Sequence, residues 1–253
     1  MQDAQIVDFT SDTGTLPTTE MLDAMREAPL GDDVYGWDPT VNRLEALAAQ
    51  MMGKEAGLFV ASGTMGNLIA LMAHTHAGQE VILEADSHLY YNEGGGMARL
   101  AGLSPRLVHG RRGIIGPSDV IEALRKPDIH YPETALLCLE NTHSRGGGSV
   151  MPVETMEEIC ALAKHNHLRT HLDGARIFNA ALALQADVKK LAEPFDSVMF
   201  CISKGLSAPV GSLLVGEASF IERGRRVRKL LGGGMRQVGV LAAAGIVALE
   251  TMI

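Results

Sequence analysis

Residues 197–205, Ser-Val-Met-Phe-Cys-Ile-Ser-Lys-Gly, form the stretch that decides the fold. Within it, residues 198–202 are an apolar, partly β-branched run of the length typical of a buried strand. Lys204 and Gly205 follow this run. Because an open α/β sheet binds its ligands at the carboxyl ends of its strands, Lys204 is expected where chemistry would take place. The plainer alternative is a solvated lysine that only follows a strand.

Similar short apolar runs recur along the chain, and helical patterns lie between most of them. Further strands are predicted at 57–61, 80–83, 106–108, 135–139, 170–172 and 212–215. Helices are predicted at 17–26, 39–51, 154–165 and 220–230, and another opens within 61–67 and runs to about His76. Strands that alternate with helices predict a three-layer α/β/α domain, with a mostly parallel seven-stranded sheet between two helical layers.

Composition narrows the class of protein. The formal net charge of −8 argues against nucleic acid or an anionic membrane as a partner. The three cysteines, Cys138, Cys160 and Cys201, lie in apolar runs without paired spacing, which favours reduced core thiols and a cytoplasmic protein. No signal-peptide pattern opens the sequence, and no apolar run approaches the length of a membrane span.

The end of the sequence is predicted to be one long apolar helix, residues 236–253. It has neither a capping glycine nor a basic last turn, and no segment follows it. An uncapped apolar helix at the end of a chain leads us to expect that the sequence was cut here.

Asp173 is the first predicted partner of Lys204. It also ends an apolar strand and meets a glycine, roughly thirty residues before Lys204, a gap that fits one strand-helix-strand unit. The two side chains should therefore emerge from nearby strand ends of one sheet. An ordinary salt bridge between strand ends is the alternative.

An anion site is predicted at residues 61–67, Ala-Ser-Gly-Thr-Met-Gly-Asn, which follow one strand and open a helix. The amides of Gly63 and Thr64 would point their N–H groups at a phosphate, with the helix dipole assisting. The alternative is an ordinary helix start capped by Ser62 or Thr64. The spacing matches neither a P-loop nor Gly-x-Gly-x-x-Gly, so a dinucleotide is not predicted.

His88 and Arg176 are two further candidates. His88 follows the strand predicted at 80–83, where an imidazole could lie flat on an aromatic ligand and exchange protons near neutral pH. Arg176 lies three residues beyond Asp173 and could reach the same ligand if a helix begins there. The alternatives are a histidine that caps a loop and an arginine in a surface ion pair.

These groups together match the requirements of one cofactor, pyridoxal 5'-phosphate. A lysine can form an imine with its aldehyde, a carboxylate can pair with its pyridinium nitrogen, and an amide nest can hold its phosphate. Desolvation and nearby positive charge would favour the neutral, nucleophilic form of Lys204. A buried carboxylate, Asp173, would keep the ring nitrogen protonated, so that the ring can accept electrons.

Seven motifs carry a resemblance to a known family. They are Thr-Ser-Asp-Thr (10–13), Gly-Asp-Asp-Val-Tyr-Gly (31–36), Ser-Gly-Thr-Met-Gly-Asn (62–67), Glu-Asn-Thr-His (140–143), Asp-Gly-Ala-Arg-Ile-Phe-Asn (173–179), Ser-Lys-Gly (203–205) and Gly-Gly-Gly-Met-Arg-Gln (232–237). In this order they resemble the low-specificity L-threonine aldolases. The resemblance implies the pyridoxal phosphate-binding large domain of the fold-type I enzymes over residues 1–253, with an N-terminal segment 1–40. It also implies retro-aldol cleavage of L-threonine and L-allo-threonine to glycine and acetaldehyde.

The resemblance also implies roles for individual cofactor-binding residues. Lys204 corresponds to the lysine that binds the cofactor covalently, and Asp173 to the partner of the pyridine nitrogen. Gly63 and Thr64 match the phosphate cradle, and His88 matches the ring-stacking histidine.

Further roles concern the substrate. Arg176 would contact a cofactor oxygen or the substrate carboxylate, and Ser11 resembles the serine that helps to hold that carboxylate. His130 resembles a second active-site histidine. His88 and His130 are both candidates for the base that removes the proton of the β-hydroxyl group, directly or through water.

The resemblance implies a homotetramer built of tight dimers, in which Tyr35 and Arg236 would reach a neighbouring subunit's site. Two departures from the family stand out. Thr10 occupies a position where the family usually has arginine. Family members also carry a small C-terminal domain after the long helix, and this sequence ends at Ile253, before any of it.

Several alternatives stay beside this interpretation. Alternating histidines could bind a metal, but no His-Glu-x-x-His or cysteine cluster accompanies them, so no catalytic metal is predicted. These histidines are His74, His76, His165, His167 and His171. The basic run 223–229 favours a solvated or subunit-facing surface in an acidic protein. For the function, a β-eliminating lyase for another amino acid and a non-catalytic fragment that binds only the cofactor or itself remain open.

Overall fold

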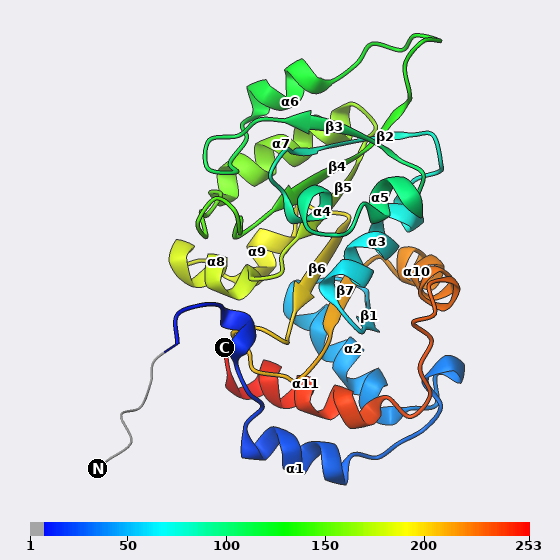
Figure 1. The fold of residues 1–253 in the computed structure, drawn as a ribbon, viewed down its shortest axis with the longest axis vertical. Coiled ribbons are helices and arrows are strands. Elements are labelled where there is room, and N and C mark those ends of the chain that lie inside the picture. Colours follow the sequence, from blue (N-terminus) through cyan, green and yellow to red (C-terminus); the bar gives the residue numbers. More distant parts are fainter. Residues whose placement is uncertain (1–7) are drawn as a thin grey trace.

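The computed structural model describes residues 8–253, which form one seven-stranded sheet covered by helices (Figure 1). The strands are β1 (Ala56–Val60), β2 (Glu80–Glu84), β3 (Ser104–Val108), β4 (Thr134–Glu140), β5 (Arg169–Asp173), β6 (Ser197–Cys201) and β7 (Ser212–Gly216). Their order across the sheet is β1-β7-β6-β5-β4-β2-β3. Six strands run in the same direction, and β7 runs opposite to them between β1 and β6. The predicted mostly parallel sheet is confirmed.

The helices lie between the strands in the chain, as the alternating pattern predicts. They are α1 (Thr19–Glu27), α2 (Pro39–Met52), α3 (Gly63–His74), α4 (His88–Tyr91), α5 (Gly96–Arg99), α6 (Pro117–Ala123), α7 (Val153–His165), α8 (Ile177–Leu184), α9 (Val188–Ala192), α10 (Ala218–Leu230) and α11 (Gly239–Thr251), with two short 3₁₀ turns, η1 (Asp12–Gly14) and η2 (Asp33–Tyr35). The sequence did not predict the short helices α4, α5, α6, α8 and α9, because four to eight residues are too few for a clear helical period.

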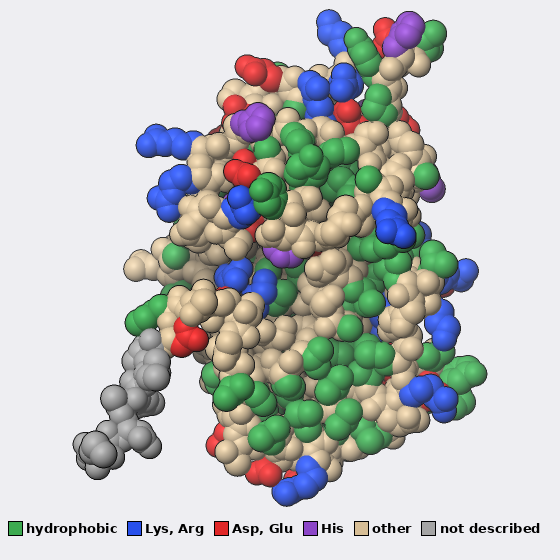
Figure 2. All heavy atoms as spheres, in the orientation of Figure 1, with side chains coloured by type: hydrophobic (Ala, Val, Ile, Leu, Met, Phe, Trp, Pro, Cys, Tyr) green, Lys and Arg blue, Asp and Glu red, His purple; other side chains and the backbone are tan. Residues whose placement is uncertain are grey.

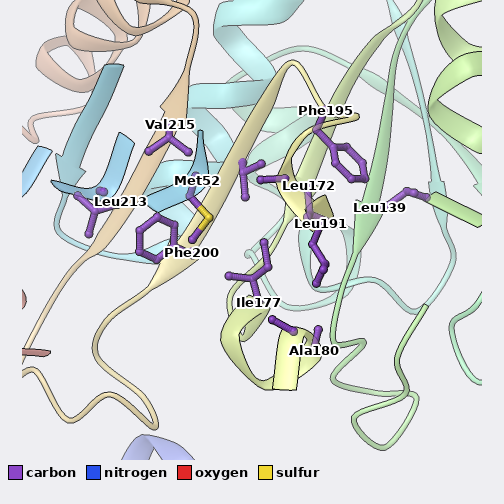
Figure 3. Packing of buried hydrophobic residues seen from close by; sticks show 14 of the residues in the cluster. Met52, Leu139, Leu172, Ile177, Ala180, Leu191, Phe195, Phe200, Leu213 and Val215 are labelled. Carbon is purple, nitrogen blue, oxygen red and sulfur yellow. The ribbon is translucent and has the colours of Figure 1, made fainter. Parts of the chain in front are cut away.

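Side chains alternate along each strand, so β2, β4, β6 and β7 each contribute to two cores. On one face of β6, Val198 and Phe200 join the larger core with residues of α1, α2, α7, α9 and α11. On the other face, Met199 and Cys201 pack with residues of α3 and α10. Figure 3 shows part of the larger core, where Phe200 and Leu213 of the sheet lie beside Met52 of α2. The three-layer α/β/α architecture is therefore confirmed.

Capping residues define the helix starts that the sequence predicts. Thr18 caps α1 by accepting the N–H of Met21, and Asp38 caps α2 by accepting the N–H of Val41. Asp38 also accepts the N–H of Gly239 at the start of α11. The last helix is shorter than the predicted 236–253, because the segment before it is bound to the 31–38 loop through the carbonyl of Arg236.

Two glycines let α3 lie close against β6. A Cβ at Gly66 would lie 2.8 Å from Cγ of Met199, and one at Gly63 would lie 3.0 Å from Sγ of Cys201. Only a residue without a Cβ permits this approach. The close packing brings the first turns of α3 onto the carboxyl end of the sheet.

The surface is mixed in character. Figure 2 shows apolar side chains gathered over the lower part of the visible face, where α1 and α11 lie in Figure 1. Leu22 of α1 and Leu30 just after it are half exposed. Among residues 8–253, no helix combines the length and the apolar character needed to cross a membrane.

Candidate active site

Asp173 is the last residue of β5 and is buried, with only 1% of its surface exposed. One carboxylate oxygen accepts the side-chain N–H of Asn67 at 2.9 Å, and the other accepts the main-chain N–H of Ala175 at 3.0 Å. A buried carboxylate held by two donors at the carboxyl edge of the sheet agrees with the predicted place of Asp173.

Lys204 lies in the loop after β6, half-buried, and its carbonyl accepts the hydroxyl of Thr15 at 2.6 Å. The predicted strand runs one residue too far, because β6 ends at Cys201. The neighbouring strands β5 and β6 are parallel, with Asp173 opposite Met199. Both side chains therefore emerge at the same edge of the sheet, and neither lies at the opposite rim.

The thiol of Cys201 lies among these charges. Burial raises its pKa; Lys204 and Arg176 act against that rise, and Asp173 adds to it. The charges of Lys204, Arg176 and Asp173 therefore all act on the buried sulfur atom of Cys201.

Gly63 and Thr64 form the first turn of α3. The hydroxyl of Ser62 caps this helix by accepting the N–H of Met65, so the alternative of a capped helix start is also correct. The amides of Gly63 and Thr64 donate to no acceptor in the described part of the chain. A solvent-accessible turn with free N–H groups can bind an anion.

His88 is the first residue of α4. Its main-chain N–H donates to Glu140 at 2.7 Å, and its Nδ1 lies 2.9 Å from Oε1 of Glu93. The hydrogen bond to Glu93 raises the pKa of His88. Side-chain atoms of His88, Glu93 and Asp173 lie within 4.8 Å of one another, which brings the imidazole to the predicted site.

Arg176 precedes α8 and makes a two-pronged ion pair with Asp12. Its Nε and Nη2 donate to the two carboxylate oxygens at 2.6 and 2.7 Å. This hydrogen bonding lowers the pKa of Asp12 and raises that of Arg176. The adjacent Ser11 accepts the N–H of Thr13. The N-terminal segment thus lies over the carboxyl edge of the sheet, a role of Asp12 that the sequence did not predict.

Three predicted site residues do not join this group within one chain. His130 precedes β4, at the amino edge of the sheet, and its ring is 78% exposed beside Asp128. Within one chain the structure therefore does not bring His130 to Asp173 and Lys204, and its role as a second active-site histidine stays a prediction. Tyr35 stacks on Trp37 at an exposed surface, and Arg236 pairs there with Asp32. Their predicted role in a neighbouring subunit's site stays a prediction.

Sequence reasoning missed a buried cluster that holds three loops at this edge. Glu84 accepts the amides of Asp86 and Gly110, and Glu140 accepts those of His88 and Ser144. Nε2 of His143, which is fully buried, lies 3.0 Å from Glu84. The motif Glu-Asn-Thr-His (140–143) contains Glu140 and His143, so this motif was the sequence feature from which the cluster could have been predicted.

Two of the histidines considered as metal ligands, His171 and His74, have other partners. Both ring nitrogens of His171 are engaged, one by Ser197 at 2.8 Å and one by Asn67 at 3.1 Å. His74 also bonds to Ser197 and stacks on Phe220, with ring centroids 4.3 Å apart. These side chains are explained by hydrogen bonds within the described chain.

The fold agrees with that of solved structures in one enzyme class. A Leishmania major threonine aldolase superposes with a TM-score of 0.84, although only 21% of residues are identical, and the match covers 95% of this chain and 71% of that one. The same three-layer fold, with acid and amine at one edge of the sheet, is the fold-type I architecture of pyridoxal phosphate-dependent enzymes.

Sequence comparison identifies the family. The model of the beta-eliminating lyase family matches residues 8–253. Low-specificity L-threonine aldolase 1 of Arabidopsis thaliana is 51% identical over 96% of this chain and 69% of its own length. The low specificity L-threonine aldolase of Escherichia coli K12 is 47% identical over 98% and 74%. The chain belongs to the beta-eliminating lyases, a pyridoxal phosphate-dependent family, and within it to the low-specificity L-threonine aldolases.

The chain is shorter than these relatives. It spans between 59% and 74% of the lengths of four curated relatives that it matches. Their activities, as whole proteins, are therefore transferred to this chain only as a proposal.

Proposed function

We propose that this protein binds pyridoxal 5'-phosphate and cleaves L-threonine and L-allo-threonine into glycine and acetaldehyde. The observation that carries the proposal is the joint placement of Asp173 and Lys204 at one edge of the sheet, beside the free amides that open α3. Family membership supports the same reaction class.

The donor set fits the cofactor. The free N–H groups of Gly63 and Thr64 suit a phosphate, and the buried carboxylate of Asp173 suits a protonated ring nitrogen. Lys204 supplies the amine that reacts with the aldehyde group of the cofactor. His88 supplies an imidazole ring that can stack on the cofactor ring. When bound, the cofactor supplies an electron sink for the electron pair of the broken Cα–Cβ bond.

The chain's own residues would orient the substrate and move one proton. Arg176 would bind the substrate carboxylate, with Ser11 beside it, because Asp12 already holds the guanidinium in a fixed plane. Nδ1 of His88 is bound to Glu93, whereas its Nε2 has no hydrogen-bond partner in the described residues. Nε2 can therefore accept the β-hydroxyl proton; cleavage then yields acetaldehyde, and a proton returned to Cα yields glycine.

Titration with pyridoxal phosphate tests this proposal. We expect saturable visible absorbance for the wild type and none for Lys204→Ala. Lys54→Met is the matched control, because Lys54 is a half-buried lysine at the amino edge, where it donates to the carbonyl of Phe195. An unchanged spectrum in Lys204→Ala would defeat the assignment. A wild type without saturable colour would identify a non-catalytic fragment instead.

A product assay separates the proposal from a second candidate, a β-eliminating lyase, which the description of the family model favours. Threonine and β-substituted amino acids are supplied in parallel to the loaded protein. Aldol cleavage produces acetaldehyde and glycine, whereas β-elimination from substrates such as serine or cysteine derivatives produces pyruvate and ammonia. Pyruvate as the main product would replace the aldolase proposal by this candidate.

We also propose that the active form is a homo-oligomer, a dimer of dimers, in which residues remote from Asp173 complete a neighbouring copy's site. The exposed Tyr35–Trp37 pair and the apolar surface over α1 and α11 support this (Figure 2). Mixing two inactive variants, Lys204→Ala and Arg236→Ala, should restore part of the activity through hybrid sites. A mixture that stays inactive would contradict shared sites. A mixture of Lys204→Ala and His130→Ala tests in the same way whether His130 completes a neighbouring copy's site.

A cytoplasmic location completes the proposal. The three cysteines are free and buried, and burial raises the pKa of each thiol. Such thiols behave as reduced core residues. Fractionation of cells that express the protein tests this location.

A further inference from the structure

Asn67 is fully buried in α3 and bridges the two acids of the site. Its Nδ2 donates to Oδ2 of Asp173 at 2.9 Å and to Oε1 of Glu93 at 2.8 Å. Glu93 in turn holds Nδ1 of His88. One side-chain amide therefore connects the carboxylate placed for the cofactor ring with the acid that holds the catalytic imidazole.

The contacts leave only one chemically sensible orientation for this amide. Its two N–H groups are used by two carboxylates, so its oxygen must accept from Nε2 of His171, 3.1 Å away. Nδ1 of His171 is then an acceptor, and the hydroxyl of Ser197 donates to it at 2.8 Å. The Ser197 oxygen remains free to accept from Nε2 of His74, also at 2.8 Å. These hydrogen bonds form a series from His74 through Ser197 and His171 to Asn67. Every donor in the series points toward Asp173 and Glu93.

The two imidazoles of the series are neutral. Burial lowers the pKa of His171 to about 3 and that of His74 to about 4. A neutral imidazole has one donor and one acceptor nitrogen, as the series requires. Hydrogen bonds aligned in one direction polarise one another, so the series strengthens the donation of Asn67 to the carboxylates.

The periodicities of the two elements build this arrangement. Asn67 and His74 are two turns apart on α3 and thus share one face of the helix. His171 and Asp173 are two residues apart on β5 and share one face of the sheet, and Ser197 of β6 lies opposite His171. Gly66 permits the close approach that brings the two faces into contact.

We propose that Asn67 is a positioning residue for the predicted cofactor site: it fixes Asp173 and the His88–Glu93 pair in one arrangement. The series His74–Ser197–His171 fixes the orientation of the Asn67 amide. The part of this inference that concerns the cofactor rests on the proposed function.

Substitutions along the series test this role. Asn67→Asp keeps the shape and the acceptor for His171 but removes both donors, so it should weaken pyridoxal phosphate binding roughly tenfold to a hundredfold, as expected for lost hydrogen bonds to a charged group. His171→Leu should weaken it by roughly tenfold or less, and Ser197→Ala by only a fewfold. The variants His171→Leu and Ser197→Ala keep the inference testable if Asn67→Asp does not fold.

A matched control separates positioning from a structural role. Thr170 is buried on β5, faces away from the series, and exchanges hydrogen bonds with Asp196. Thr170→Val should lower the urea-unfolding stability of the protein without cofactor yet leave cofactor affinity within about twofold of the wild type. The inference requires that the loss of cofactor affinity is largest for Asn67→Asp, smaller for His171→Leu and smallest for Ser197→Ala. This order must not depend on how much stability each variant loses. Affinity that only follows stability would overturn it.

A second readout needs no cofactor. Nitrogen-15 NMR of the histidine rings in the wild-type protein should show His171 and His74 as neutral tautomers that carry the proton on Nε2. A His171 proton on Nδ1 would reverse the series and overturn the inference. If the wild type binds no pyridoxal phosphate, the proposed function fails, while the tautomer still decides the direction of the series.

Discussion

At the amino edge of the sheet the buried Glu80 and the half-buried Asp196 each face a cation, whereas at the carboxyl edge the buried acids face one another. Glu80 accepts from Arg125 and from the hydroxyl of Thr134, and Asp196 accepts from Arg169 and Thr170. At the other edge, main-chain amides, the Asn67 amide and the imidazoles of His88 and His143 hold the acids. These acids are Glu84, Glu93, Glu140 and Asp173.

The pKa values of the acids are shifted in opposite directions at the two edges. Burial raises the pKa of Glu93 and of Glu140, and the nearby charge of Asp173 raises both further. Burial also acts to raise the pKa of Asp196, but hydrogen bonds from Thr170 and Arg169 outweigh it, and the pKa is lowered. The amino edge thus stabilises the fold, whereas the carboxyl edge holds unfavourable charges together, as expected where a ligand is to bind.

The largest expected effect comes from exchanging one acid at each edge. Asp173→Asn should reduce turnover by at least about a hundredfold, because it removes the charge opposite the ring nitrogen. It should change stability little, since it also relieves repulsion with Glu93 and Glu140. Asp196→Asn should cost about 1–3 kcal/mol of stability and leave cofactor affinity unchanged. Threonine-cleavage assays, urea unfolding and cofactor titration of both variants measure turnover, stability and cofactor affinity.

One outcome would break the comparison between the edges. If Asp196→Asn reduced turnover as strongly as Asp173→Asn did, the two edges would not be functionally distinct.

A steric change can disturb the carboxyl edge without altering any charge. A Cβ at Gly113 would lie 2.2 Å from the ring of His143, and the residue has a φ of +78°. Gly113→Ala should therefore cost about 2–4 kcal/mol and impair activity through the loops that Glu84 and Glu140 hold. Gly148→Ala is the control, because Gly148 has a φ of +71° but open space around it. Its strain should cost about 1 kcal/mol. Equal losses of stability in thermal unfolding would show that the fit around His143 is unimportant.

Local sequence patterns were sufficient for the parts of the site that depend on strand ends. All seven strands lie where the apolar runs predict them, and Asp173 and Lys204 lie at the same edge because parallel neighbours share their direction. The same logic places His130 at the amino edge of the sheet, because the strand predicted at 135–139 follows it, whereas its role in a site is implied by the family resemblance alone.

The rest of the site depends on contacts between residues distant in the chain. Asn67 and Asp173 meet because α3 packs closely on β5, and no local pattern encodes that distance. The cluster of Glu84, Glu140 and His143 likewise joins loops after two different strands. Hydrogen-bond partners of this kind follow from tertiary packing, which periodicity alone does not specify.

The smallest expected effect is a difference in the pH dependence of stability at the two edges. The pKa of Glu93 is raised above its ordinary 4.5, so its ionisation costs stability as pH rises through the folded-state value. The hydrogen bond with Glu93 raises the pKa of His88 above its ordinary 6.5, so this contribution is complete below pH 6.5 and is lost as pH rises further. Glu93→Gln removes both effects, and its stability relative to the wild type should increase by about 1 kcal/mol from pH 4 to pH 8.

Asp196→Asn should show the opposite slope. The pKa of Asp196 is lowered below its ordinary 3.8, so its contribution is present above pH 3.8 and is lost as pH falls through the folded-state value. Relative to the wild type, this variant should therefore be least stable near neutral pH and should recover in acid. Urea unfolding at pH 3, 4, 6 and 8 measures both slopes. Parallel slopes would mean that direct cationic partners and neutral amides hold buried acids equally well, and the contrast between the edges would then have no energetic basis.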